Sequence, residues 1–271
     1  MFKKDFNDLT ILDDYIFCRV MTIKPSLCQR ILITIIENPV GKLHIAESQK
    51  IIKSFIDSKG IRLDVYAEDA KNIYDLEMQT TNKNNLIERS RYYLSLSDTE
   101  NLKPGEEYKK VKNTYIIFIC DYDLFNKGEA KYIVREHIEK ETGEFILDTN
   151  YNGEYAKIYL NLKADLKRIQ SKNLKDLIHY MNTGIPSSKL TKELDEEVKK
   201  IKNSSIERRK YMTLQYYFEQ EIKEERRKEK EENSKEIALK LLKRRKDTVK
   251  EISKLTSLSI KEINELKKQL S

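Results

Sequence analysis

The stretch LDVYAEDAKNIYDLEMQ, residues 63–79, contains three polar residues, Asp64, Glu77 and Gln79, that could together form a site for cleaving a phosphate ester. If the stretch forms a two-stranded hairpin, Asp64 lies opposite Glu77, with Cβ atoms about 5–6 Å apart. Two carboxylates this close repel each other unless a cation lies between them, and Mg²⁺ prefers such oxygen ligands. A bound Mg²⁺ lowers the pKa of its water and stabilises charge that develops on a phosphate. Gln79, on the same face as Glu77, could orient that water by a hydrogen bond.

Alternating apolar and polar residues predict the two strands that would carry this site, GIRLDVYAE (60–68) and NIYDLEMQT (72–80). One face of the hairpin is apolar, and the other holds the acids. The strands would pair around Ala70-Lys71, which is a poor two-residue turn compared with Asn-Gly, so we expect a longer loop or a bulge there. The plain alternative to a catalytic site is a solvent-facing hairpin with its acids in water.

Further strands and helices are predicted on both sides of the hairpin. Apolar residues at helical spacing predict helices over 13–21, 26–38 and 84–96, and strand patterns cover 113–123, 130–138 and 156–162. Strands interleaved with helices indicate a mixed α/β layer architecture.

Composition and charge narrow the class of protein. Of 271 residues, 39 % are hydrophobic and 9 % aromatic, which is typical of a folded globular chain. The net charge of +7 suits a nucleic-acid partner, although many proteins without one share it. Three scattered cysteines favour neither a disulfide framework nor zinc, so we expect a cytoplasmic protein. No apolar run reaches 18 residues and no phosphate-binding glycine motif occurs, so we expect no membrane span and no nucleotide cofactor.

Six blocks of the chain match one known family in the same order. They are DDYIFCRVM, DSKGIRLDVYAED, IYDLEMQT, ERSRYYLSL, NTYIIFICDYDLF and KYMTLQ. Together they closely resemble the Rpn family of recombination-promoting nucleases and transposases, within the PD-(D/E)XK nuclease superfamily, over about residues 5 to 220. The resemblance implies a restriction-endonuclease-like mixed sheet flanked by helices. It also implies a DNA endonuclease of little sequence specificity, linked to recombination or to mobile elements.

The resemblance assigns roles to the hairpin residues. Asp64 takes the place of the superfamily's first carboxylate and Glu77 that of the second, so both would bind Mg²⁺ or another divalent cation such as Mn²⁺ or Ca²⁺. Gln79 stands at the superfamily's lysine position, as in the E-x-Q variant of this family, and Leu63 stands where the motif has proline. Because glutamine carries no charge, Arg89 or a second metal would have to supply the missing positive charge.

Three residues on the predicted helices have two interpretations each. Asp14 matches a family acid that relatives often send toward the metal, but it also suits a helix N-terminus because of the helix dipole. Arg89 and Tyr93, four residues apart on one helix face, could contact DNA. Alternatively, Tyr93 packs on the sheet while Arg89 pairs with an acid such as Asp75.

Three zones organise the chain: a nuclease-like domain over 1–186, a charged helical spacer over 187–233 and a small helical tail over 234–271. In the tail, Thr248 with Glu251 and Ser259 with Glu262 are capping-box patterns that predict two short helices around a tight turn. The pair is similar to a helix-turn-helix, with Ser257 where the family often has glycine. We favour docking on the body or on another subunit for this tail, with DNA reading as the alternative.

Two functional hypotheses follow. The first is a metal-dependent DNA endonuclease, in which double-strand cutting would need two active sites and hence a homodimer or higher homo-oligomer. The second is a non-catalytic DNA-binding or assembly protein that retains the nuclease fold, because Gln79 is uncharged and the tail is separable. The pair of mutually repelling carboxylates, Asp64 and Glu77, favours the enzyme.

Overall fold

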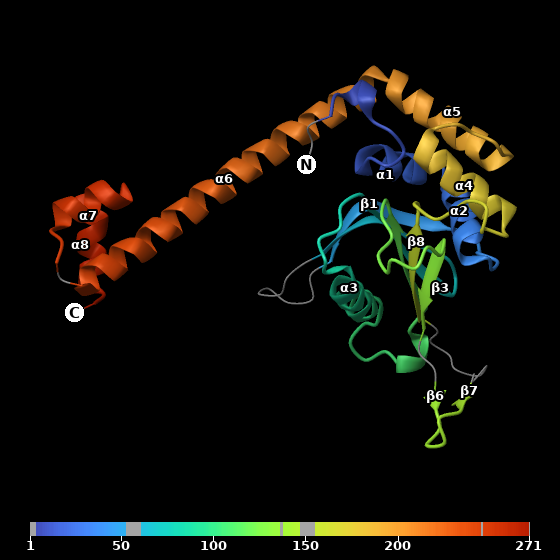
Figure 1. The fold of residues 1–271 in the computed structure, drawn as a ribbon, viewed down its shortest axis with the longest axis horizontal. Coiled ribbons are helices and arrows are strands. Elements are labelled where there is room, and N and C mark those ends of the chain that lie inside the picture. Colours follow the sequence, from blue (N-terminus) through green and yellow to red (C-terminus); the bar gives the residue numbers. More distant parts are fainter. Residues whose placement is uncertain (1–3, 53–60, 136–137, 147–154, 245, 271) are drawn as a thin grey trace. The chain divides into compact units, whose positions relative to one another are not determined.

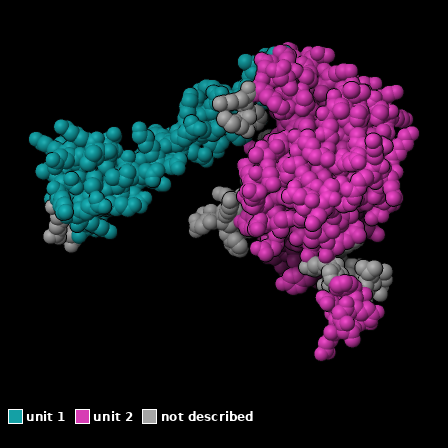
Figure 2. Space-filling view, viewed as in Figure 1, with its two compact units in different colours: residues 1–3, 208–271 teal, residues 4–207 magenta. Residues whose placement is uncertain are grey.

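The computed structural model describes residues 4–52, 61–135, 138–146, 155–244 and 246–270. These residues form two compact units, 4–207 and 208–271 (Figure 2). The first unit contains a β-sheet with helices on both faces, and the second contains most of one long helix and two short ones (Figure 1). Gly60 and residues 136–137, at the ends of two predicted strands, lie outside the described residues.

A mixed sheet forms the centre of the first unit, in the strand order β1-β2-β3-β4-β8-β5. Strands β1, β2 and β3 pair antiparallel, β4 and β8 continue the sheet parallel to β3, and β5 closes it antiparallel to β8. The bounds are β1 His44–Ile52, β2 Ile61–Glu68, β3 Asn72–Gln79, β4 Asn113–Cys120, β5 Lys131–Val134 and β8 Tyr155–Asn161. A separate small hairpin consists of β6 Ile138–Glu139 and β7 Phe145–Ile146. The predicted mixed α/β sheet is confirmed, and β1 is an edge strand that sequence analysis missed.

Helices cover both faces of the sheet (Figure 1). Helices α1, α2, α4 and α5 lie on one side and α3 on the other. Their bounds are α1 Asp14–Ile23, α2 Pro25–Ile36, α3 Leu86–Asn101, α4 Lys172–Thr183 and α5 Lys189–Asn203, with single 3₁₀ turns at Phe6–Asp8 and Tyr108–Lys110. Helix α2 begins with Pro25 at its first position, where the missing N–H has no intrahelical partner in any case.

Helix α5 belongs to the first unit, although its many charges led us to assign it to the spacer. Its apolar residues Leu194, Val198 and Ile201 are buried. Two ion pairs, Lys24–Glu197 and Arg30–Glu193, each 2.6 Å long, connect its acids to the helices at the start of the chain. The compact unit therefore extends to Glu207 and not only to residue 186.

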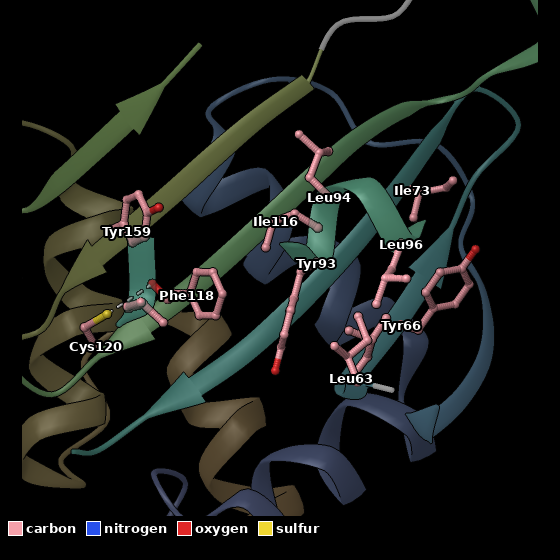
Figure 3. Packing of buried hydrophobic residues seen from close by; sticks show 12 residues of the cluster. Leu63, Tyr66, Ile73, Tyr93, Leu94, Leu96, Ile116, Phe118, Cys120 and Tyr159 are labelled. Atoms are coloured by element: carbon pink, nitrogen blue, oxygen red, sulfur yellow. Dashed lines mark hydrogen bonds between the residues drawn. The ribbon is translucent and has the colours of Figure 1, made fainter. Parts of the chain in front are cut away.

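Helix α3 packs on one face of the sheet (Figure 3), and the pairing of Asp75 with Ile116 and of Glu77 with Phe118 puts the acids on that face. Tyr93, Leu94 and Leu96 of this helix pack with Ile116 and Phe118 of β4 in one buried cluster. Phe118 in turn stacks on Tyr159 of β8, with ring centroids 5.8 Å apart. The acid-bearing face is thus interior, so the solvent-facing alternative for the hairpin is wrong.

The β2–β3 hairpin has the predicted register. Val65 pairs with Leu76 and Glu68 with Ile73, so the strands turn at Ala70-Lys71. Residues 69–71 connect the strands, and the N–H of Asp69 donates to the carbonyl of Asn72 at 2.9 Å. The expected bulge is absent between these two described strands, whereas the connection is one residue longer than a two-residue turn.

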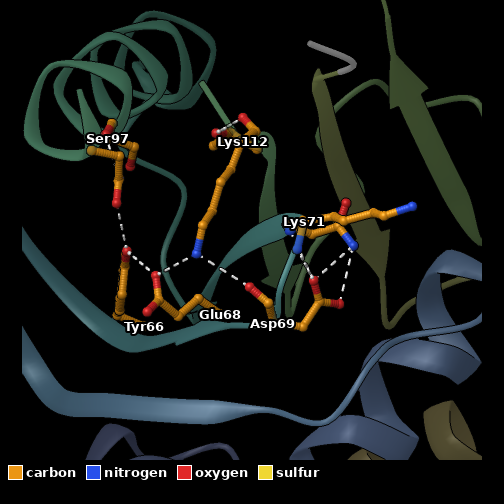
Figure 4. A network of polar contacts seen from close by, with 9 residues as sticks. Tyr66, Glu68, Asp69, Lys71, Ser97 and Lys112 are labelled. Atoms are coloured by element: carbon orange, nitrogen blue, oxygen red, sulfur yellow. Dashed lines mark hydrogen bonds and ion pairs between the residues drawn. The ribbon is translucent and has the colours of Figure 1, made fainter. Parts of the chain in front are cut away.

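The Asp69 side chain explains why an unfavourable turn sequence suffices (Figure 4). Its Oδ1 accepts hydrogen bonds from the backbone N–H groups of Lys71 and Asn72, each at 2.8 Å, and its Oδ2 accepts from the Tyr74 hydroxyl at 2.9 Å. Burial alone would raise the pKa of Asp69, but these hydrogen bonds outweigh it and lower the pKa to about 2. The carboxylate thus satisfies the turn's amides in place of the usual Asn-Gly geometry.

The second unit contains most of α6 Ser205–Arg244, together with α7 Val249–Thr256 and α8 Ile260–Lys268. Both predicted capping boxes are present, Thr248 with Glu251 and Ser259 with Glu262. The two short helices are thereby confirmed. Ala238, Ile252, Leu258 and Ile263 form a small buried core between α6, α7 and α8. Among the described residues, no helix is long and apolar enough to cross a membrane.

Candidate active site

The side chains of Asp64 and Glu77 each accept a hydrogen bond from a backbone N–H of the other residue's strand. The Asp64 N–H donates to Oε1 of Glu77 at 2.9 Å, and the Met78 N–H donates to Oδ2 of Asp64 at 3.1 Å. These bonds lie just beyond the last backbone pair of β2 with β3, Val65 with Leu76. Each carboxylate therefore uses one oxygen to fix its position against the other strand.

Burial makes this acid pair costly to ionise. Only 6 % of Asp64 and 2 % of Glu77 is exposed. Burial, then the charge of Asp14, raises the pKa of Asp64 to about 7. Burial, then the charges of Asp75 and Asp64, raises the pKa of Glu77 well above its usual value. A divalent cation would remove this cost, because it favours the ionised form of each acid.

Asp75 is a third buried acid on the same face, two residues before Glu77. Its side chain is fully buried, and neither of its carboxylate oxygens accepts a hydrogen bond from the described residues. Burial, followed by the charge of Asp64, raises the pKa of Asp75 well above its usual value. Sequence analysis placed Asp75 on the same face as Glu77 but gave it a role only as a partner for Arg89. The signal that could have singled it out is the alternation that places residues 75, 77 and 79 on one face.

Arg89 of α3 lies beside Gln79 at the end of β3. Its Nη1 donates to Oε1 of Gln79 at 3.0 Å, and its Nη2 donates to the Tyr93 hydroxyl at 3.1 Å. The guanidinium charge acts on all three buried acids and lowers their pKa values, against the larger effect of burial. A fixed positive charge is therefore present beside Gln79.

The packing alternative for Arg89 and Tyr93 is met in part. Tyr93 is 8 % exposed and packs on the sheet, with its ring centroid 6.0 Å from that of Phe118. Arg89, which is half-buried, makes no ion pair with Asp75 in the described part of the chain. Gln79 and Arg89 are both partly exposed, unlike the acids behind them, so a substrate would approach from this end of β3. DNA binding by Arg89 and Tyr93 stays a prediction.

Asp14, the first residue of α1, is close enough to act electrostatically on the pair. Its negative charge is the largest charge effect that raises the Asp64 pKa, and burial raises the pKa of Asp14 itself. The same helix contacts β2 through Cys18, whose Sγ donates to the Asp64 carbonyl at 3.2 Å. Within the described residues, however, no three Asp, Glu, His or Cys side chains are grouped as a ready metal-binding set. A role for Asp14 as a ligand stays a prediction.

The donor set fits a hard divalent ion. Mg²⁺ keeps several of its waters and binds proteins through one or two carboxylates, and Asp64 with Glu77 supplies two. The acids lie in an interior, carboxylate-rich environment where a cation is favoured, and both Asp75 oxygens there lack a donor among the described residues. The residues present therefore suit an oxygen-bound metal and not a zinc site of cysteines and histidines.

Comparison with known families identifies the family of the chain. The model of a PD-(D/E)XK nuclease family transposase matches residues 12–239. The chain belongs to this PD-(D/E)XK family. A search of curated proteins finds no match. Nucleases of the PD-(D/E)XK family generally use divalent cations and act on DNA. The match covers the whole sheet and most of α6, whereas α7 and α8 lie beyond it.

Proposed function

We propose that this PD-(D/E)XK protein is a metal-dependent DNA endonuclease that hydrolyses phosphodiester bonds with little sequence specificity. The observation that carries the proposal is the buried pair of Asp64 and Glu77, each fixed by a backbone N–H of the other strand. An acid pair that is costly to ionise is well suited to a cation and poorly suited to a purely structural role. Recombination or mobile-element activity is the physiological setting that the family suggests.

Asp64 and Glu77 would hold the ion, with Mg²⁺, Mn²⁺ and Ca²⁺ as the candidates. When bound, such an ion lowers the pKa of a water and stabilises negative charge on the phosphate. The protein's own contribution is to fix both carboxylates before the metal arrives, since β2 and β3 hold them rigidly. Burial of both acids also keeps competing water away from the charges.

Gln79 and Arg89 divide the task that lysine performs elsewhere in the superfamily. Because Oε1 of Gln79 already accepts from Arg89, the Gln79 amide presents its NH₂ group as a donor. That donor orients a water or a phosphate oxygen at the site. Arg89 supplies the positive charge that glutamine lacks, held in place by Gln79 and Tyr93.

A non-catalytic DNA-binding protein that retains the nuclease fold is the second candidate. The uncharged Gln79 and the separate helical unit favour it. In that case the acids would be dispensable, and divalent ions would leave DNA binding unchanged.

Cleavage of supercoiled plasmid by wild type, Asp64→Ala and Glu88→Gln, with and without Mg²⁺, separates these two candidates. Glu88 is a matched control because it is an exposed acid on α3, next to Arg89 in sequence. We expect metal-dependent nicking or linearisation by wild type and Glu88→Gln, and its loss in Asp64→Ala. Undiminished metal-dependent cleavage by Asp64→Ala would overturn the proposal. Absence of cleavage in all three proteins, with DNA still bound, would support the second candidate.

A further inference from the structure

Nearly all of the protein's net positive charge lies in its last 38 residues. Residues 234–271 contain eleven lysines and arginines against five acids, a net charge of +6, whereas the chain as a whole carries +7. Residues 1–233 are therefore almost neutral, with 41 basic and 40 acidic residues. Because neutralised phosphates dominate the affinity of proteins for DNA, the charge distribution directs attention to this segment.

The same segment has the dimensions of a helix-turn-helix. Helix α7 has eight residues, α8 has nine, and three residues, 257–259, connect them. Ser257 adopts a left-handed conformation, with φ of 61°, at the position where such turns usually have glycine. Ile252 of α7 and Ile263 of α8 are fully buried and pack with Ala238 of α6. The helix lengths, the short turn and the shared core resemble those of a three-helix unit that contains a helix-turn-helix.

The outward face of α8 is polar and carries two lysines, one asparagine and one acid. Lys261, Asn264 and Lys268 recur at intervals of three and four residues, on the side opposite the buried Ile263. All three are exposed, as is Glu265 between them. Lysine pairs with phosphates and with guanine, and asparagine pairs with adenine in the major groove. At the start of α8, Ile260 is 48 % exposed and could contact a thymine methyl group.

Basic residues also precede this face. Lys243 and Arg244 end α6, Lys246 precedes α7, and Lys250 and Lys254 lie on α7. In helix-turn-helix proteins the first helix crosses the phosphate backbone while the second enters the groove. These five basic residues lie before α8 in the chain, where contact with the phosphate backbone is expected.

We propose that α7 and α8 form a helix-turn-helix that binds duplex DNA, with α8 in the major groove and the basic residues before it on the phosphates. This site lies outside the residues that match the nuclease family, and it does not depend on the acid pair of the sheet. Sequence analysis favoured protein docking for the tail. A protein partner would favour an apolar outer face on α8, whereas that face carries two lysines, an asparagine and Glu265, with a single exposed apolar residue, Ile260, at its start.

Binding of a fluorescein-labelled 30-base-pair duplex by the full-length protein in EDTA tests this proposal. EDTA prevents metal-dependent cleavage of the duplex. The measured affinity therefore does not depend on whether the acid pair of the sheet is a working nuclease site. The test variant is Lys261→Glu/Lys268→Glu, and the matched control is Lys228→Glu/Lys230→Glu, which changes the net charge equally at exposed positions of α6. Circular dichroism and hydrogen exchange of α7 and α8 verify that the fold is intact.

At 0.1 M salt we expect the test variant to raise Kd about tenfold or more and to reduce the salt-dependence slope by about two phosphate contacts. The control should change Kd by less than about threefold. Equal weakening in both variants would overturn the proposal, because net charge alone would then explain binding. Unchanged affinity in the test variant would also overturn it, and a changed oligomeric state at unchanged affinity would assign the α8 face to contacts between copies.

Discussion

At the scale of residues, the protein buries three carboxylates whose negative charges would be compensated by a bound cation. Asp64 and Glu77 are fixed by backbone N–H groups, while Asp75 has no hydrogen-bond donor among the described residues. The charge of Arg89 lowers the pKa values of these acids, but its hydrogen bonds go to Gln79 and Tyr93. Without a cation, ionising these buried acids lowers the stability of the fold, and this loss of stability can be measured.

The metal-free protein should lose stability as the pH rises. The pKa of Asp64 is raised from 3.8 to about 7, so its protonated form stabilises the fold below about pH 4, and that contribution disappears as the pH rises through 7. Asp64→Asn keeps an acceptor for the Met78 N–H and never ionises. Its unfolding free energy relative to wild type should therefore increase by on the order of 2–4 kcal/mol between pH 5 and pH 8 in EDTA. Urea unfolding measures this, and a difference that does not vary with pH would refute the expectation.

Removing the Arg89 charge should slow cleavage. Arg89→Gln deletes the positive charge beside Gln79, which lacks one of its own, so we expect the cleavage rate at saturating Mg²⁺ to fall about 10- to 100-fold. Arg91→Gln is the matched control because Arg91 is exposed two residues further along α3. The measurement is the single-turnover rate on a duplex oligonucleotide. Equal losses in the two variants would show that general basicity, and not the Arg89 position, matters.

At the scale of elements, the β2–β3 hairpin and helix α3 build the site together. The hairpin register places Asp64 next to Glu77, and α3 closes the face above them and adds Arg89. The short turn at Ala70-Lys71 maintains that register. A one-residue slip would move every acid of one strand to the opposite face of the sheet.

Asp69→Ala should therefore destabilise the hairpin and the site. The substitution removes the acceptor of the Lys71 and Asn72 amides and of the Tyr74 hydroxyl, at a cost of about 2–3 kcal/mol in unfolding free energy at pH 7. The pKa of Asp69 is lowered to about 2, so its contribution is present above pH 4 and should diminish as the pH falls towards 2. Asp69→Asn, which keeps one acceptor oxygen, should lose less. A penalty equal in both variants, or independent of pH, would contradict this explanation of the turn.

At the scale of the whole molecule, periodicity predicted some features and three-dimensional packing decided the others. Alternation was enough to predict the hairpin, its register and the shared face of Glu77 and Gln79. It could not reveal that α3 covers this face, because a polar face is expected to meet water whether or not a helix packs on it. Strand β1 was missed because the polar run AESQK lacks an alternating apolar pattern.

Helix α5 was misplaced for a related reason. Its charged residues dominate its composition, but Leu194, Val198 and Ile201 form the narrow stripe that packs. The contact between Arg89 and Gln79 joins elements whose distance depends on the complete fold, so no sequence spacing could predict it. The short helices α7 and α8 were predictable because their capping boxes are local.

The central claim is that the buried acid pair of the sheet holds a divalent ion. Titration calorimetry of Mn²⁺ into metal-free wild type, Glu77→Gln and Glu88→Gln at pH 7, in two buffers of different ionisation enthalpy, tests it most directly. Because burial raises the pKa values of Asp64 and Glu77, binding should release on the order of one proton. We predict this release in wild type and Glu88→Gln, with affinity at least about tenfold weaker in Glu77→Gln. Equal affinity and equal proton release in Glu77→Gln would contradict the claim.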